Sequence, residues 1–208
     1  MQIDLSKIGM EKGCQYETII TTCDSAGKLN AAPIGVICRG SDKVMCRIFK
    51  GSHTLENIIS QREFVVNITH DPLLFTWSLL DNLLDEDFDE DKSIRNMDCY
   101  FKCKVTDLKE AVKQSDPIKK KSEAIVIKAD VCELIIRNPI NSYNRAFGYV
   151  MESLANFSRF DTVDDEKRKY YADSFREAYR VVKKVGSKKE KKAMENIRRK
   201  INEKGYDV

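Results

Sequence analysis

Short runs of β-branched and apolar residues, separated by polar turn sequences such as DSAGK and GSDK, occupy the first two thirds of the chain. Such runs are typical of β-strands joined by tight reversals. The pattern predicts six strands: Tyr16 to Thr22, Leu29 to Arg39, Val44 to Phe49, Glu63 to Thr69, Met97 to Asp107 and Ala124 to Ile136. Strands of this number and spacing favour an antiparallel, closed or partly closed β-barrel.

Two segments among these strands have a helical pattern. In His53 to Ser60 the apolar residues recur at helical spacing, and Ser52 or Thr54 can cap the first turn. The sequence DPLLFTWSLLDNLL begins near a proline and carries a broad apolar face. We expect it to form a helix or compact loop packed on the mouth of the barrel.

The pattern changes to helix after Asn138-Pro139. Apolar stripes at helical spacing predict helices over Ser142 to Phe160 and Asp164 to Lys184, and a lysine-rich helix over Lys188 to Lys204. The expected core positions of the first two are Phe147, Val150, Met151, Leu154, Phe157, Tyr171, Phe175, Tyr179 and Val182. The predicted fold is therefore mainly β with C-terminal helices (α+β). Residues 1–138 form the barrel domain, and residues 139–208 form a helical region packed on the barrel or on a partner subunit.

Composition excludes several classes of protein. Hydrophobic residues make up 42% of the 208 residues and charged residues 33%, as in an ordinary globular chain, and the net charge of +3 implies neither nucleic acid nor membrane as a partner. The N-terminal sequence lacks the pattern of a signal peptide, and no apolar run has the roughly 20 residues of a membrane span. Seven scattered cysteines without a CxxC pair favour reduced thiols. We expect a cytoplasmic protein without a metal site.

Seven acidic residues lie between Asp81 and Asp91. Their spacing lacks the glycine and the terminal glutamate of a calcium-binding loop. We therefore expect a solvated loop, whose function the sequence leaves open.

The stretch from Leu29 to Thr69 combines groups that suit a flavin mononucleotide. A phosphate dianion is best held by a guanidinium, hydroxyl groups and the N–H groups of a helix start, which Arg47, Ser52 and Thr54 supply. A flat ring needs small residues beneath it, and those available are Asn30, Ala31, Ala32 and Gly35. Pro33 marks a strand edge or bulge, because proline cannot donate to a sheet ladder. Asn67 and Thr69 share one strand face.

The motifs NAAPIGV, RIFKGSHTLENI and EFVVNITHDPLLF resemble the FMN-binding split-barrel flavoproteins, which include flavin reductases and pyridoxamine-phosphate-oxidase-like proteins. They are most similar to an uncharacterised, mainly archaeal branch. The resemblance covers Tyr16 to about Phe75, and more loosely reaches Asn144 to Phe160.

This resemblance implies FMN as cofactor and a homodimer with the flavin near the subunit interface. It implies that the isoalloxazine is lined by Asn30, Ala31, Ala32, Pro33, Ile34 and Gly35. The phosphate would be reached by Arg47, Ser52 and Thr54, and the pocket completed by Asn57, Asn67 and Thr69.

The reaction itself stays open at this stage. No residue stands out as a catalytic acid or nucleophile, since His53 and His70 fit surface or capping positions, and the nicotinamide-side residues of the reductases have no counterpart. A flavin-dependent oxidoreductase of unknown substrate is the first hypothesis, because a bound flavin itself supplies redox chemistry. A non-catalytic flavin carrier or sensor is the alternative.

Nucleic-acid binding is a further alternative, because residues from 140 onward hold 17 Lys and Arg against 11 Asp and Glu. Lysine-rich terminal helices are usually solvated, however, and the predicted barrel lacks a strand studded with aromatic residues for base stacking. We therefore do not expect a nucleic-acid partner.

Overall fold

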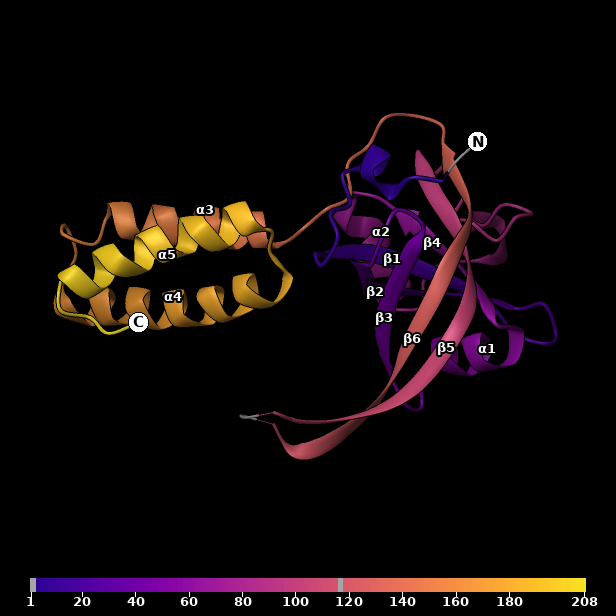
Figure 1. Cartoon of the computed structure of the whole chain (residues 1–208), viewed down its shortest axis with the longest axis horizontal. Coiled ribbons are helices and arrows are strands. Elements are labelled where there is room, and N and C mark those ends of the chain that lie inside the picture. Colours follow the sequence, from indigo (N-terminus) through magenta and orange to yellow (C-terminus); the bar gives the residue numbers. More distant parts are fainter. Residues whose placement is uncertain (1–2, 116–117) are drawn as a thin grey trace. The chain divides into compact units, whose positions relative to one another are not determined.

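The computed structural model describes residues 3–115 and 118–208, and the side chains of residues 112–122 are not part of that description. The chain divides into two compact units, Met1–Tyr143 and Asn144–Val208. The first unit holds the strands and the second holds three helices (Figure 1).

The first unit is a closed antiparallel barrel, which confirms the predicted fold class. Its strands lie around the barrel in the order β1-β2-β3-β6-β5-β4. Their bounds are Gln15–Cys23 (β1), Leu29–Cys38 (β2), Lys43–Phe49 (β3), Glu63–Ile68 (β4), Cys99–Ser115 (β5) and Ile118–Ile136 (β6). Helix α1 (His53–Gln61) connects β3 to β4, and α2 (Pro72–Leu79) follows β4. Short 3₁₀ turns form at Leu5–Ile8 (η1) and Asp85–Asp87 (η2).

The interior of the barrel is filled by every second residue of each strand, as the period of two requires. The fully buried side chains there include Ile20, Val36, Val44, Ile68, Phe101 and Ile127. The outer face of β1 is buried as well, because residues 84–98, which we call the covering segment, pack over it together with α2. Burial on both faces explains why β1 contains a nearly continuous apolar and threonine run.

Strands β5 and β6 are longer than the sequence predicted. Their pairing continues past the predicted limits of Asp107 and Ala124 and reaches Ser115 opposite Ile118. The extension forms a two-stranded ribbon that leaves the barrel (Figure 1). Lysine, glutamate and serine dominate the sequence of the ribbon, so it has no alternation of hydrophobic and polar residues from which a strand could be predicted.

The second unit consists of α3 (Ala146–Ser158), α4 (Asp165–Val185) and α5 (Lys188–Glu203), which share one core. On α4 the predicted positions Tyr171, Phe175 and Val182 are buried. On α3 the prediction was wrong for three residues: Phe147, Met151 and Leu154 are 61%, 49% and 43% exposed, although Val150 is buried. Helices α4 and α5 cover only some of the apolar residues on one side of α3, so helical spacing alone predicted too many buried residues there. No helix among the described residues is long and apolar enough to cross a membrane.

Candidate functional site

The barrel is closed between β2 and β3 by only three residue pairs, Val36–Cys46, Ile37–Met45 and Cys38–Val44. The register would next bring Gly35 opposite Arg47, but the ladder ends before them. Beyond this point β2 pairs with β1 alone, and β3 pairs with β6 alone. We call this opening the split; it is bordered by β2 from Asn30 to Gly35, the end of β3 and the start of α1.

The position of Pro33 agrees with this geometry. It lies in the part of β2 that has no β3 partner, so its missing N–H interrupts no ladder on that side. The predicted strand edge is therefore confirmed.

The start of α1 lies beside the split. Gly51 precedes it with φ of +82°, a left-handed conformation that favours glycine. Ser52 is the N-cap: its Oγ accepts a hydrogen bond from the Leu55 N–H at 3.3 Å and donates one to the Phe49 carbonyl at 3.1 Å. The N–H groups of His53 and Thr54 point out of the helix start without an intrahelical acceptor. These are the groups that an anion binds at a helix N-terminus.

Two hydrogen bonds connect α1 to the ends of β1 and β2. Asn30 donates from Nδ2 to Thr54 Oγ1 at 3.0 Å, and Asn57 donates from Nδ2 to Thr22 Oγ1 at 3.1 Å. Thr54 and Asn57 are buried, and for the hydroxyl proton of Thr54 the described residues offer no hydrogen-bond acceptor. The structure thus brings together three predicted residues and adds Thr22, which the sequence analysis missed. Thr22 ends a threonine-rich strand, where nothing in the sequence separates a site residue from an ordinary strand residue.

The predicted floor of the site is formed by β2. Ala31 is buried, while Ala32, Pro33 and Ile34 are half-buried. A Cβ built on Gly35 would lie 2.2 Å from Nε2 of Gln15 on β1, at the far end of a flexible side chain. The Gln15 side chain therefore covers this end of the floor.

Arg47 lies on the outward face of β3 and is exposed. Among the described side chains it has no carboxylate partner, and it makes no hydrogen bond to Ser52 or Thr54. Its guanidinium group is therefore free to bind an anion at the border of the split.

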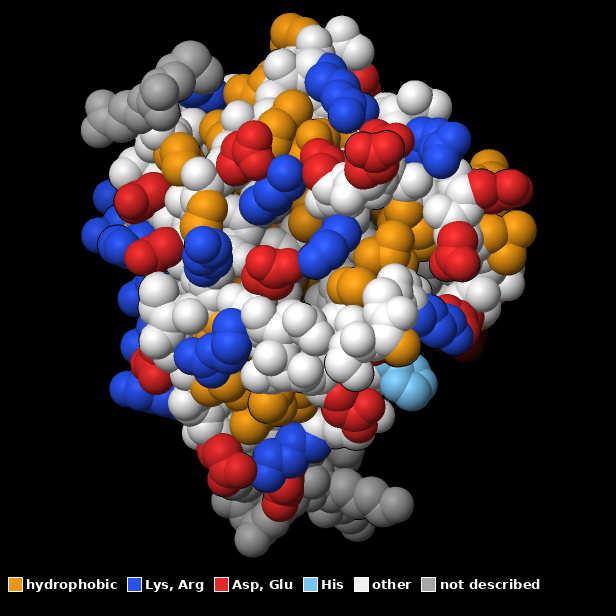
Figure 2. Space-filling model, turned by 90° about the vertical axis from the view of Figure 1, so that its right-hand side faces the viewer, with side chains coloured by type: hydrophobic (Ala, Val, Ile, Leu, Met, Phe, Trp, Pro, Cys, Tyr) orange, Lys and Arg blue, Asp and Glu red, His pale blue; other side chains and the backbone are white. Residues whose placement is uncertain are grey.

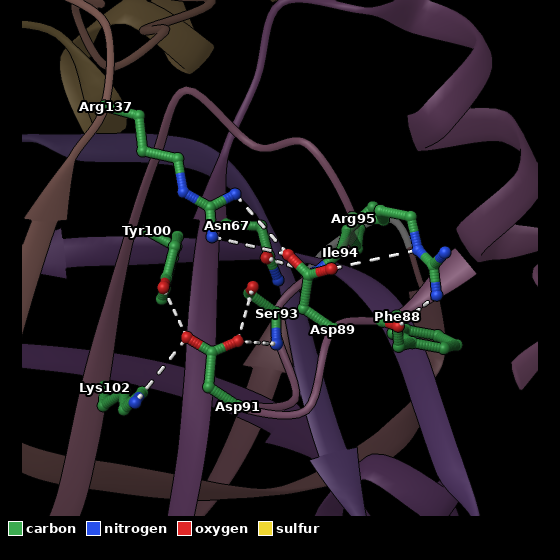
Figure 3. Close-up of polar contacts among 10 residues, drawn as sticks. All are labelled: Asn67, Phe88, Asp89, Asp91, Ser93, Ile94, Arg95, Tyr100, Lys102 and Arg137. Atoms are coloured by element: carbon green, nitrogen blue, oxygen red, sulfur yellow. Dashed lines mark hydrogen bonds and ion pairs between the residues drawn. The ribbon is translucent and has the colours of Figure 1, made fainter. Parts of the chain in front are cut away.

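Asn67 and Thr69 do not join this group. Asn67 is fully buried under the covering segment: Nδ2 donates to the Ile19 carbonyl at 3.0 Å and to Thr21 Oγ1 at 2.8 Å, and Oδ1 accepts from the Ile94 N–H at 2.9 Å. Thr69 is also buried, and its Oγ1 accepts from the Asp71 N–H at the start of α2. In this structure Asn67 therefore holds the covering segment to β1 and β4 (Figure 3).

The prediction of a solvated acidic loop was wrong for Asp89 and Asp91, although Glu90 between them is exposed. Asp91 accepts hydrogen bonds from the Tyr100 hydroxyl and from the N–H and hydroxyl of Ser93, and it lies 3.7 Å from Lys102 Nζ (Figure 3). Asp89 pairs with Arg95 and Arg137. Charge density alone predicted solvation, whereas Tyr100 and Lys102 of β5, and Arg137 directly after β6, hold these carboxylates against the barrel.

Partial burial acts to raise the pKa of Asp91, but the hydrogen bonds from Tyr100 and Ser93, helped by Lys102, outweigh it and hold this pKa below its ordinary value. Burial, reinforced by the neighbouring carboxylate, raises the pKa of Tyr100. Near neutral pH the pair is therefore a carboxylate that accepts from a neutral phenol.

His53 begins α1 beside the split, whereas His70 lies beyond the end of β4. His53 and His70 are exposed, as expected; His53 is 3.6 Å from Glu56, and His70 bonds to the Asn141 carbonyl. All seven cysteines are free thiols, and five are buried: Cys14, Cys38, Cys46, Cys99 and Cys103. Among the residues whose side chains the structure describes, no group of three or more His, Cys, Asp or Glu residues could hold a metal ion.

Comparison with known proteins agrees with this architecture. The FMN-bound protein MM1853 from Methanosarcina mazei shares 25% identity and a TM-score of 0.52, over 93% of this chain and 98% of that one. A curated protein from Methanocaldococcus jannaschii, described as uncharacterized, is 26% identical over 190 residues, which are 89% of this chain and 97% of that protein. Flavoredoxin from Methanosarcina acetivorans is more distant, with 15% identity and a TM-score of 0.45 over 61% of this chain and 71% of that one.

Two family models together span most of the chain. Residues 16–138 match the N-terminal domain of the proteins of unknown function called DUF447, and residues 144–199 match a second DUF447 model. The boundary between them coincides with the division between the barrel and the helices. The resemblance to split-barrel flavoproteins with archaeal relatives is thus confirmed, and the chain belongs to the DUF447 family.

Proposed function

We propose that this protein binds FMN at the split and acts as a flavin-dependent oxidoreductase. The observation that carries the proposal is the opening between Gly35 and Arg47, with the free start of α1 beside it. The FMN bound to the Methanosarcina mazei protein, which matches 93% of this chain, supports the same cofactor.

The residues present fit the phosphate. Four donor groups donate no hydrogen bond to the described residues and can bind a phosphate. They are the N–H groups of His53 and Thr54, the hydroxyl of Thr54 and the Arg47 guanidinium. Ser52 supports them by capping the helix, because both its hydrogen bonds are internal. Asn30 and Asn57 act as positioning residues, because each fixes α1 to the barrel wall.

The exposed edge of β2 fits the ring. Between Asn30 and Gly35 the backbone is paired on one side only, so N–H and C=O groups remain for the polar edge of an isoalloxazine. The small side chains of Ala31 and Ala32 allow a close approach. A bound flavin would supply hydride and electron transfer, while the protein contributes position and electrostatics.

The visible spectrum of the purified protein tests cofactor binding. We expect a flavin absorption band, and added FMN should restore it after the cofactor has been stripped. A colourless protein that does not quench FMN fluorescence on titration contradicts the proposal.

Turnover needs a separate test, because binding alone would also suit a carrier or sensor. Oxidation of NADH or NADPH by the FMN-loaded protein should proceed at a steady rate with an added electron acceptor. A second outcome is that the flavin binds without repeated cycles of reduction and reoxidation, whether the electron donor is NADH, NADPH or dithionite with an added acceptor. In that case the oxidoreductase proposal fails and the alternative of a flavin carrier remains.

We also propose a homodimer, formed through the apolar surface of α2 and the residues after it. This surface exposes Leu73, Trp77, Leu79, Leu80 and Leu84, at between 41% and 70% of their area. Large contiguous apolar patches on soluble proteins mark interaction sites. Light scattering should give twice the mass of 24.0 kDa, and Leu79→Asp with Leu80→Asp should give monomers.

The proposed compartment is the cytoplasm. Seven free cysteines, five of them buried, suit a reducing environment. A fluorescent fusion in an archaeal host tests it; a signal at the cell envelope would contradict it.

A further inference from the structure

A pocket of about 580 Å³ lies on the outer wall of the barrel, and Thr22, whose hydroxyl accepts from Asn57, is one of its lining residues. Its walls come from the ends of β1 and α1, from β4, β5 and β6, and from the covering segment. The volume is in the range of small-molecule sites. Gln61 at the last turn of α1 lines it, whereas the split lies at the first turn, about 12 Å away along the helix axis.

Acidic and basic side chains line this pocket in equal numbers, three of each: Glu63, Asp91, Glu133, Lys92, Lys102 and Lys104. Figure 2 shows that on the side of the barrel unit that carries α1, side chains of both signs alternate around hydrophobic surface. Five of the six have partners inside the set. Glu63 bonds to Lys92 at 2.7 Å, and Lys102 bonds to Glu133 at 2.9 Å and lies near Asp91.

Lys104 is the exception. The strand register places it opposite Glu63 on β4 and opposite Asp130 on β6. Glu63 reaches instead to Lys92 of the covering segment, and Asp130 bonds to Lys43 at 2.9 Å. Among the described side chains no carboxylate pairs with Lys104, so its ammonium group is left without a counterion at the pocket wall.

Contacts within the protein hold the roof of the pocket. Asp91 and Lys92 belong to the covering segment, which is fixed by the buried Asn67 amide and by the bonds from Tyr100 and Ser93 to Asp91. A preformed cavity avoids the entropic cost of ordering a loop on binding. We propose that this pocket binds a small organic anion, whose carboxylate or phosphate group is held by the Lys104 ammonium group.

Apart from Thr22, no residue of the proposed flavin site lines this pocket, and two thiols make it testable. Cys23 and Cys132 line the pocket and are half-buried and exposed, respectively. Iodoacetate carries a carboxylate, whereas iodoacetamide is its neutral counterpart, so the two reagents report whether an anion binds beside the thiols. The rate of Cys132 alkylation can be followed by mass spectrometry on the full-length protein, with and without FMN.

We expect the rate with iodoacetate to saturate as its concentration rises, and the rate with iodoacetamide to stay linear. Lys104→Met should abolish saturation and lower the iodoacetate rate at low concentration about fivefold, which corresponds to about 1 kcal/mol for a partly screened charge. The matched control Lys7→Met, at the opposite end of β1, should leave both rates unchanged. Loading with FMN should change neither result.

Competition identifies the chemistry of the anion. Succinate that slows iodoacetate indicates a carboxylate ligand, and inorganic phosphate that does so indicates a phosphate ligand. The proposal is overturned if the iodoacetate rate rises linearly with concentration and is equal in the wild-type and Lys104→Met proteins. It is also overturned if neither succinate nor phosphate competes with iodoacetate. Equal thermal unfolding temperatures of the wild-type and Lys104→Met proteins would show that the difference in rate comes from the pocket and not from a loss of folded protein.

Discussion

The side-chain amide of Asn30 donates a hydrogen bond to Thr54 Oγ1 over 3.0 Å and so joins β2 to the first turn of α1. The two residues are 24 positions apart in sequence and border the same opening of the barrel. Together with the hydrogen bond from Asn57 to Thr22, this contact therefore positions the proposed phosphate site.

Thr54→Val should remove this contact while keeping the shape of the side chain. The Asn30 amide would lose its acceptor, so we expect the free energy of unfolding to fall by about 1–2 kcal/mol and FMN to bind at least tenfold more weakly. Urea denaturation and FMN fluorescence titration measure the two effects. Thr54→Ser keeps the hydroxyl and is the control; equal affinity in both variants would rule out a role for the hydroxyl.

Ser52→Ala and Arg47→Met should separate stability from binding. Loss of the Ser52 cap should cost about 1 kcal/mol of stability. Arg47 is exposed and pairs with no described carboxylate, so its replacement should leave the urea midpoint unchanged but weaken FMN binding. Unchanged FMN affinity in Arg47→Met would show that this guanidinium does not reach the phosphate.

Asn67→Leu should release the covering segment. The substitution removes the acceptor of the Ile94 N–H and the amide that bonds to the Ile19 carbonyl and the Thr21 hydroxyl, all under a packed surface, so we expect a loss of about 3 kcal/mol. Hydrogen exchange at the Ile94 amide should accelerate more than exchange inside the barrel. Uniform acceleration over the whole barrel would instead indicate global destabilisation.

Stability should depend on pH through Asp91. The pKa of this carboxyl is below its ordinary value of 3.8 in the folded protein, so its stabilising contribution is present above that value and is lost as pH falls through the folded-state pKa. The urea midpoints of the wild-type protein and Asp91→Asn should therefore differ at pH 7 and begin to converge as the pH falls below 3.8. A difference that stays constant with pH would exclude this charge as its source.

Only two of the seven thiols should react in the native protein. Burial raises the pKa of Cys46 and Cys99 to about 12 and that of Cys103 well above its ordinary value, so these thiols are neutral as well as inaccessible at pH 8. Titration with an aromatic disulfide reagent should give two fast equivalents, from Cys23 and Cys132. All seven should react in guanidinium chloride.

Local sequence patterns were sufficient to predict the barrel and its first helix, because alternation and helix caps are properties of neighbouring residues. Ser52 and Pro33 were placed correctly for this reason. The contacts of Asn67 could not be predicted, because its partners Thr21 and Ile94 lie 46 and 27 residues away. The shared face of Asn67 and Thr69 was read from the strand period, which does not reveal what covers that face.

The acidic segment shows the same limit. Its residues are alike in sequence, yet Asp85 and Glu86 are exposed whereas Asp91 is held by Tyr100. Which carboxylates are bound depends on where β5 and β6 present their donors. That information is contained in the register of distant strands and not in the segment itself.

The short ladder between β2 and β3 also bears on solubility. It leaves one edge of β2 unpaired from Asn30 to Gly35, and an unpaired edge is a template on which another chain can add a strand. A ligand that satisfies these backbone groups would protect against such edge-to-edge aggregation. Supplying riboflavin during expression is therefore expected to raise the yield of soluble protein, since the proposed cofactor would cover this unpaired edge.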